Sequence, residues 1–201
     1  MAIPLATPLN QVIQRKGTQS TKWEKYGDRD ILPFWIADMD FASPDFVLQA
    51  LQQRLEHPIL GYSQQPDSLT QAFQGWLVHH FGWQVREEWI VWLPGVVPGL
   101  NMAAHTLTSD QSIMIPTPVY YPFLAIGENA HVEQILTPLR LVNGRWEMDI
   151  DHMGQQLAKN TKMVFIANPQ NPTGRAYSLK ELQALAEFIQ TNDLLLVSDD
   201  I

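Results

Sequence analysis

The sequence contains no cysteine, and this absence excludes several kinds of site. Disulfide frameworks, thiolate zinc sites, iron–sulfur clusters and cysteine nucleophiles all require a thiol. Any covalent chemistry in this protein must therefore use another side chain.

Basic residues are also scarce, with 13 Lys and Arg against 21 Asp and Glu and a formal net charge of −8. The longest basic cluster is the pair formed by Arg15 and Lys16. Such a charge balance argues against a surface for nucleic acid or for an anionic membrane. It leaves small or anionic substrates bound in a pocket as candidates.

Long hydrophobic runs are missing as well, because no window approaches the roughly 18 apolar residues that span a bilayer. The first ten residues are interrupted by Pro4 and Pro8 and lack the basic and apolar regions of a signal peptide. We therefore expect a cytoplasmic protein. Hydrophobic residues make up 45% of the 201 residues, enough for the core of one domain or of one domain and an incomplete second.

The first part of the chain predicts an irregular arm followed by two helices. Residues 1–42 show no sustained periodicity and form the predicted N-terminal arm. Ser43 before Pro44 predicts an N-cap for a helix that continues to about Glu56. Ser68, with Gln71 three residues later, predicts a capping box for a second helix that ends near Phe81.

The rest of the chain, residues 43–201 with these helices included, is typical of an α/β domain with a mostly parallel sheet. Short apolar runs predict strands that are buried on both faces, although a buried piece of helix fits the same pattern. Ser178 and Glu181 form a second capping-box pattern at the start of a helix between two of these runs, which indicates a βαβ unit. Asn143 and Gly144 predict a hairpin turn. The four predicted strands are 89–93, 112–115, 163–167 and 194–198, and a further helix is expected over 100–106.

Suggestive groups follow the carboxyl ends of these strands, where ligands bind in open α/β sheets. A glycine-containing turn spans residues 94–99, two tyrosines follow the second strand, and Asp199 and Asp200 close the last strand. Each of these features alone also fits a plain connection, a packing contact or a helix cap. The string Asn168-Pro-Gln-Asn-Pro-Thr-Gly174 is more specific, because its prolines restrict both asparagines to extended conformations.

This string, with Ser198-Asp199 at the end of the next strand, resembles the class I/II aminotransferase superfamily of fold-type I pyridoxal-phosphate (PLP) enzymes. The resemblance covers about Val12 to Ile201 and narrows to the MalY/PatB type of cystathionine beta-lyase. It implies a three-layer αβα fold, with residues 1–42 as an arm that contributes to the substrate pocket and residues 43–201 as part of the large PLP-binding domain. The additional motifs are Arg15-x-x-Thr-x-Ser-x-Lys-Trp23, Trp35-Ile-Ala-Asp-Met-Asp-Phe41, Ser43-Pro44, Gly61-Tyr-Ser63 and Leu93-Pro-Gly-Val-Val-Pro-Gly99.

The resemblance also implies a role for each strand-end residue. Asp199 matches the carboxylate that keeps the ring nitrogen of PLP protonated, and Asn171 matches the amide that binds its phenolic oxygen. Tyr120 matches the aromatic residue that stacks on the pyridine ring, with Tyr121 as the alternative. Asp200 points to the other side of the strand, so one member of the Asp199–Asp200 pair is expected to be structural.

Further matches extend the implied site to the phosphate and to the substrate. The main-chain N–H groups of Val96 and Val97 are expected to bind the phosphate, whereas many relatives offer Ser or Thr side chains there. Tyr62 resembles a tyrosine that reaches the phosphate in a neighbouring subunit, which implies a homodimer. Ala37 and Asp38 lie where the arm of the family lines the substrate pocket. No metal site is indicated.

The lysine that forms the family's imine lies beyond the aspartate, and no lysine of this chain stands in that context. The last predicted strand also lacks a covering helix, so we expect an N-terminal part of a longer design. The resemblance implies a carbon–sulfur lyase acting on cystathionine or a cysteine-like substrate. A PLP-dependent aminotransferase, a non-catalytic or regulatory remnant and a nucleotide-binding α/β domain are the alternatives. The lysines of the chain are Lys16, Lys22, Lys25, Lys159, Lys162 and Lys180.

Overall fold

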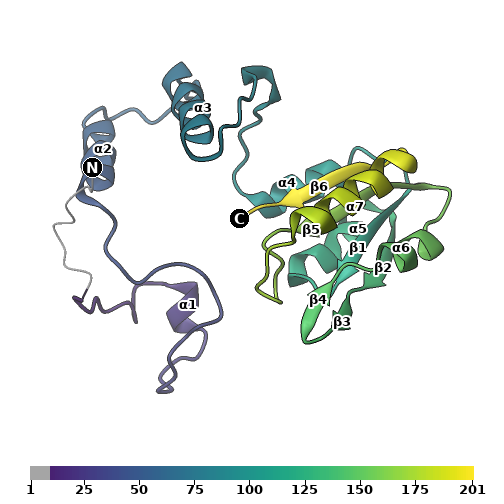
Figure 1. Cartoon of the computed structure of the whole chain (residues 1–201). Coiled ribbons are helices and arrows are strands. Elements are labelled where there is room, and N and C mark those ends of the chain that lie inside the picture. The colour runs from purple at the N-terminus through teal and green to yellow at the C-terminus, as the bar shows by residue number, and fades with distance from the viewer. Residues whose placement is uncertain (1–9) are drawn as a thin grey trace. The chain divides into compact units, whose positions relative to one another are not determined.

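The structure is a computed structural model that describes residues 10–201, so the stretch with Pro4 and Pro8 lies outside the described residues. The chain divides into two compact units, Met1–His79 and His80–Ile201 (Figure 1). The expected boundary after residue 42, which separates an arm from a cofactor domain, stays a prediction. No helix within residues 10–201 has the length and apolarity needed to cross a bilayer.

From residue 10 onward, the N-terminal unit contains three helices joined by irregular segments. They are α1 (Thr21–Glu24), α2 (Asp45–Leu55) and α3 (Asp67–Phe81), whose last two residues lie in the second unit. Both expected helices are confirmed, but both expected N-caps are wrong. Pro44 is the N-cap of α2, because its ψ of 140° keeps it extended and the helix begins one residue later than Ser43 requires. Ser68 already lies inside the first turn of α3, so it cannot be the cap of that helix.

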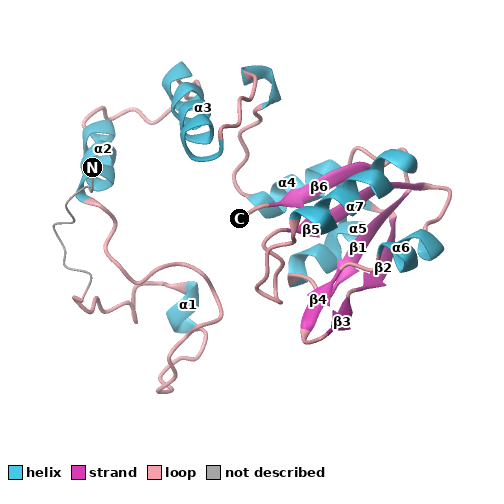
Figure 2. Ribbon diagram, in the orientation of Figure 1, coloured by secondary structure: helices cyan, strands magenta, loops and turns pink. Residues whose placement is uncertain are grey.

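The C-terminal unit contains a parallel four-stranded sheet in the order β2-β1-β5-β6 (Figure 2). The strands are β1 (Ser112–Thr117), β2 (Glu133–Pro138), β5 (Thr161–Ala167) and β6 (Leu195–Asp199). A separate hairpin pairs β3 (Arg140–Val142) with β4 (Arg145–Glu147). The helical segments are η1 (Glu87–Trp89), α4 (Val96–Ala104), η2 (Tyr121–Ala125), α5 (Ile126–Ala130), α6 (Ile150–Gln156) and α7 (Leu179–Thr191).

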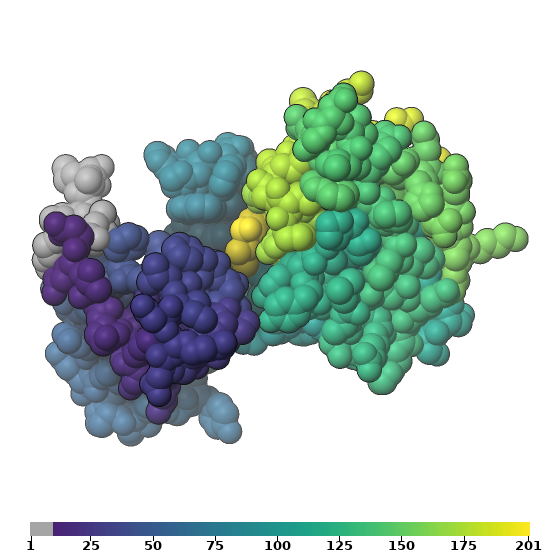
Figure 3. Space-filling model, turned by 90° about the horizontal axis from the view of Figure 1, so that it is seen from below, coloured from purple at the N-terminus to yellow at the C-terminus, as the bar shows by residue number. Residues whose placement is uncertain are grey.

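Apolar side chains fill both faces of this sheet and make the unit a three-layer αβα structure. On one face, Ile113 and Phe165 pack with residues of α4, η2 and α5. On the other face, Met114 and Val164 pack with α6 and α7. The expected α/β fold with a mostly parallel sheet is therefore confirmed. Figure 3 shows the second unit from below, coloured teal to yellow.

Three of the four expected strands are present, and the fourth is wrong. Residues 112–115, 163–167 and 194–198 fall within or overlap β1, β5 and β6. Residues 89–93 begin in η1 and continue without strand pairing in the described part of the chain. A strand requires a hydrogen-bonded neighbour, and apolar composition alone does not supply one. The helix expected over 100–106 begins four residues earlier, at Val96.

Two local predictions are confirmed by their backbone geometry. Ser178 and Glu181 form both hydrogen bonds of a capping box at the start of α7, which connects the parallel strands β5 and β6. Asn143 and Gly144 have φ angles of 51° and 77° between β3 and β4, as the twist of a two-residue hairpin requires.

Candidate functional site

The carboxyl ends of β1, β5 and β6 meet at one edge of the parallel sheet. Ala167, the last residue of β5, is paired with Asp199, the last residue of β6. β1 runs parallel to β5, so the loop that begins after Thr117 leaves the sheet at the same edge. This edge therefore collects Tyr120, the loop 168–174 and Asp199 from three separate parts of the sequence.

Asp199 is anchored through its main chain and is partly exposed at its side chain. Its carbonyl accepts a hydrogen bond of 2.8 Å from the N–H of Asn168, the residue that opens the neighbouring loop. Its Oδ1 atom accepts a bond of 3.2 Å from the N–H of Ile201. The adjacent Asp200 is exposed, and its Oδ1 accepts from the Ser198 hydroxyl at 2.8 Å. The two neighbouring carboxylates thus have different surroundings.

Tyr120 faces this edge, whereas its neighbour Tyr121 is 70% exposed. Tyr120 packs against the same core cluster as Val96 and Val197, and its ring meets that of Tyr121 edge-on at 5.0 Å between centroids. Burial raises the pKa of the Tyr120 phenol, and Tyr121 and the Asp199 carboxylate raise it further. The Asp199 carboxylate therefore lies close enough to the Tyr120 phenol to act on it electrostatically.

A cavity of about 390 Å³ lies between the start of α4 and the end of β6. Gly95, with a φ of 157°, is the N-cap of α4 and offers no side chain to the first turn. The first N–H groups of a helix have no acceptor within the helix, so they are available to an anion. Val96 and Val97 are half-buried at this position. Residues that line the cavity include Val91, Leu93, Gly95, Val96, Val197 and Ser198.

The loop 168–174 presents one exposed amide and holds two others in hydrogen bonds. Asn171 is exposed. The Oδ1 of Asn168 accepts from the N–H of Tyr177 at 3.1 Å. Gln170, which no sequence motif singles out, is only 2% exposed and donates to the carbonyl of Pro118 in the Tyr120 loop. A polar residue between two prolines gives no sequence signal for such a contact.

An ion pair fixes the far end of this loop. The two terminal guanidinium nitrogens of Arg175, Nη1 and Nη2, donate to the Glu181 carboxylate, Nη1 at 2.8 Å, and Nη1 also donates to the carbonyl of Trp146 in β4. The guanidinium and the capping-box bonds to Ser178 lower the pKa of Glu181 to about 2 despite partial burial. The loop is thereby held against both α7 and β4.

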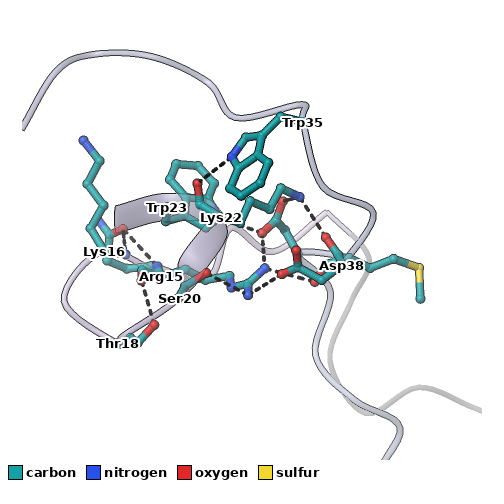
Figure 4. A network of polar contacts seen from close by, with 11 residues as sticks. Arg15, Lys16, Thr18, Ser20, Lys22, Trp23, Trp35 and Asp38 are labelled. Atoms are coloured by element: carbon teal, nitrogen blue, oxygen red, sulfur yellow. Dashed lines mark hydrogen bonds and ion pairs between the residues drawn. The ribbon is translucent and has the colours of Figure 1, made fainter. Parts of the chain in front are cut away.

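The N-terminal unit contains a different arrangement, which we call the arm network (Figure 4). Arg15 binds one oxygen of Asp38 and one of Asp40, each at 2.6 Å. Lys22, only 8% exposed, donates to the other oxygen of Asp40 and to the carbonyl of Asp38, each at 2.8 Å. The indole N–H of Trp23 also donates to Asp40 at 2.8 Å. These donors, with Lys22 first, hold the pKa of Asp40 well below its usual range.

The arm network joins two motifs that the sequence presents separately. Its donors come from residues 15–23 and its acceptors from residues 38–40, and the Trp35 indole donates back to the carbonyl of Lys22 at 3.3 Å. The expected substrate-pocket residue Asp38 therefore has its carboxylate in an ion pair, and Ala37 beside it is exposed. Tyr62 is fully exposed in the same unit.

Residues 10–201 contain no group of three acidic or histidine side chains that could hold a metal ion.

Comparisons with known proteins agree on one family. The family model for aminotransferase class I and II matches residues 29–201. Cystathionine beta-lyase PatB of Bacillus subtilis is 37% identical over 195 residues, which cover 94% of this chain and 50% of that protein.

Solved structures show the same relationship. The crystal structure of OvoB superimposes with a TM-score of 0.90 at 40% identity and covers 97% of this chain and 52% of its own. The PLP-bound C-S lyase from Staphylococcus hominis gives a TM-score of 0.88 at 33% identity, covering 97% of this chain and 51% of its own. The fold is therefore that of fold-type I PLP enzymes. The chain spans about half the length of the curated relatives it matches.

Proposed function

Because this chain belongs to the aminotransferase class I and II family, an enzyme family, we propose that it forms part of a PLP-dependent carbon–sulfur lyase. The proposed reaction cleaves the bond between the β-carbon and sulfur of cystathionine or a cysteine-like amino acid. One observation carries the proposal: Asp199, Tyr120 and the first turn of α4 surround one edge of the sheet in a chain similar to a cystathionine beta-lyase.

The residues at this edge fit the chemical groups of PLP. A carboxylate can accept a hydrogen bond from a protonated ring nitrogen, and an aromatic side chain can stack on the ring face. Free N–H groups at the start of a helix can bind a phosphate. Val96 and Val97 supply only main-chain donors for that phosphate. The cavity beside them, at about 390 Å³, lies within the size range of small-molecule sites.

When bound, PLP supplies an electron sink for the charge that develops at the substrate's α-carbon. The chain's own residues would tune and orient that sink. Asp199 would hold a proton on the ring nitrogen, and Asn171 would donate its amide to the phenolic oxygen. Tyr120 would pack on the ring and exclude water from one face, a contact of order 1 kcal/mol.

Two of the lysines of this chain lie away from the proposed site or in other contacts. Lys22 binds Asp40 in the arm network, and Lys162 lies near the start of β5, at the opposite edge of the sheet. We therefore expect the 201-residue chain to bind PLP without a covalent imine. Lyase activity is proposed for a protein of the relatives' full length that carries this chain.

We also propose a homodimer in which Tyr62 contributes to the neighbouring subunit's site. Its complete exposure, and the exposed apolar side chains of α2 and of the loop that precedes Tyr62, support an interface role. The exposed apolar residues of α2 and the following loop are Phe46, Val47, Leu48, Leu51, Leu55, Ile59 and Leu60.

Cofactor binding by the chain itself tests the first step of this proposal. We expect PLP to quench the fluorescence of the purified chain saturably and Asp199→Asn to weaken binding by about tenfold or more, the loss of a charge-assisted hydrogen bond. Asp200→Asn is the matched control and should bind as the unsubstituted chain does. A lysine adduct trapped by borohydride would contradict the expected non-covalent mode, and equal binding by both variants would remove Asp199 from the site.

The reaction distinguishes the lyase from its alternatives in the full-length protein. Release of a thiol, pyruvate and ammonia from cystathionine supports the lyase. Transfer of the amino group to an added keto acid supports the aminotransferase, which the family assignment also allows. Binding of PLP without either reaction supports a non-catalytic protein.

A further inference from the structure

Gln170, the third residue of the loop 168–174, is the most buried residue of that loop. Gln170 is 2% exposed, whereas its neighbours Pro169 and Asn171 are exposed. A glutamine amide carries two donors and an acceptor, and burying it without partners costs about 1–3 kcal/mol. The contacts of Gln170 therefore require an explanation.

Gln170 bonds to two loops at once. Its Nε2 donates to the carbonyl of Pro118 at 2.5 Å, across 52 residues of sequence. Its Oε1 accepts from the N–H of Thr173 at 3.0 Å. Its main chain donates to the carbonyl of Arg175 and accepts from the N–H of Gly174, both at 2.7 Å. One side chain thus shapes its own loop and connects that loop to another.

Each of the two connected loops carries one residue that we assign to PLP: Tyr120 to the ring face and Asn171 to the phenolic oxygen. Tyr120 lies two residues after Pro118, and Asn171 directly follows Gln170. We propose that Gln170 is a positioning residue that sets the distance between the Tyr120 loop and the Asn171 loop and so preforms the PLP site. This role rests on the proposed function. A preformed site binds more tightly because less loop ordering accompanies binding.

Gln170→Glu separates the two bonds of the side chain. Glutamate keeps the length and the acceptor for Thr173 but replaces the donor to Pro118 with an oxygen that repels the carbonyl. Gln183→Glu is the matched control, because Gln183 is exposed on α7. Should Gln170→Glu fail to fold, Gln170→Met keeps the side-chain length and removes both bonds.

Hydrogen exchange on the 201-residue chain, followed by mass spectrometry, measures how well the amide groups of each loop are protected. We expect Gln170→Glu to accelerate exchange about tenfold in peptides covering 117–123 and 170–175, since a lost hydrogen bond of about 1.4 kcal/mol corresponds to that factor. Peptides of β5 and the Gln183→Glu chain should be unchanged. Faster exchange in only one loop, or in neither, would overturn the connection that we propose.

Titration with PLP then tests whether the connection matters for the site. We expect the dissociation constant of PLP to rise about tenfold in Gln170→Glu while circular dichroism shows that the chain remains folded. Looser loops with unchanged affinity would overturn the positioning role while leaving the proposed function intact. A failure of the unsubstituted chain to bind PLP would instead contradict the proposed function, and the positioning role with it.

Discussion

The two units of this chain are stabilised in different ways. In residues 80–201 the sheet is covered on both faces by large apolar side chains, several of them fully buried, such as Ile113, Phe123 and Phe165. In residues 10–79 the buried side chains are Lys22, Pro33, Thr70 and Leu77. The second unit is therefore organised by apolar burial, and the arm of the first unit by charged hydrogen bonds.

This difference indicates which part of the candidate site is fixed by the fold itself. Apolar burial involves no titrating group and is not screened by salt as ion pairs are, so the strand ends near Tyr120 and Asp199 stay in place whenever the sheet is folded. Exposed ion pairs are weak and screened by salt, so the arm depends on the cooperation of several donors on Asp40. The comparison predicts that substitutions in one unit leave the other unchanged.

Phe165→Ala should give the largest effect and should act on the second unit alone. The side chain is fully buried in β5, and truncating a buried phenylalanine typically costs about 3–5 kcal/mol. Urea denaturation followed by circular dichroism measures the loss. Tryptic cleavage of the arm after Lys22 should keep its rate under native conditions, and a parallel change there would break the comparison.

Glu181→Gln should destabilise the second unit less, by about 2–3 kcal/mol, because it leaves the Arg175 guanidinium without its charged partner. The same denaturation experiment measures the difference. Glu187→Gln is the control, since Glu187 is exposed on the same helix. Equal stability of the two variants would show that the ion pair contributes nothing to the fold.

The pKa of Glu181 predicts a pH window for this contribution. Its pKa falls from 4.5 to about 2 on folding, so the folded state favours the charged form. The stabilisation is complete above pH 4.5 and decreases as the pH falls toward about 2. Unfolding free energies between pH 6 and pH 3, chosen to bracket the upper part of this window, should therefore decline more in the unsubstituted chain than in Glu181→Gln. Parallel declines would contradict the assignment.

Sequence patterns predicted those parts of the fold whose signal is local. The capping box of α7 and the Asn143-Gly144 turn are defined by neighbouring residues, and both are confirmed. β2 was missed because it is an edge strand with a mixed pattern of exposure, from Glu133 to Pro138. The run 89–93 was assigned to a strand because composition does not reveal whether a pairing partner is present.

The residues of the candidate site likewise differ in whether a local sequence pattern points to them. The sequence predicts Asp199 and Tyr120 as site residues because both come shortly after apolar runs, a position that the sequence displays. Gln170 was missed because a glutamine in a proline-rich loop is ordinarily exposed, and its partner Pro118 is distant in sequence. The pairing of Arg15 with Asp38 spans 23 residues and follows no helical or strand period. Long-range polar contacts are the part that patterns do not encode.

Asp40→Asn should have the smallest effect on global stability, and its main effect should be local, on the protection of the arm around Lys22. The amide removes the charge that Lys22 and Arg15 share, while an oxygen remains for the Trp23 indole. Since Lys22 is buried in this network, its release should speed tryptic cleavage after Lys22 several-fold and leave the melting of the second unit unchanged. Mass spectrometry of timed digests at neutral pH, where the Asp40 carboxylate is charged, identifies the cleavage site.

Asp28→Asn provides the matched control for this prediction, because Asp28 is an exposed carboxylate of the same arm. It should be cleaved like the unsubstituted chain. Faster cleavage in both variants would mean that the net charge of the arm, and not the bonds to Asp40, governs protection. Unchanged cleavage in Asp40→Asn would mean that apolar contacts hold the arm after all, and the contrast between the two units would then disappear, since both would depend on burial.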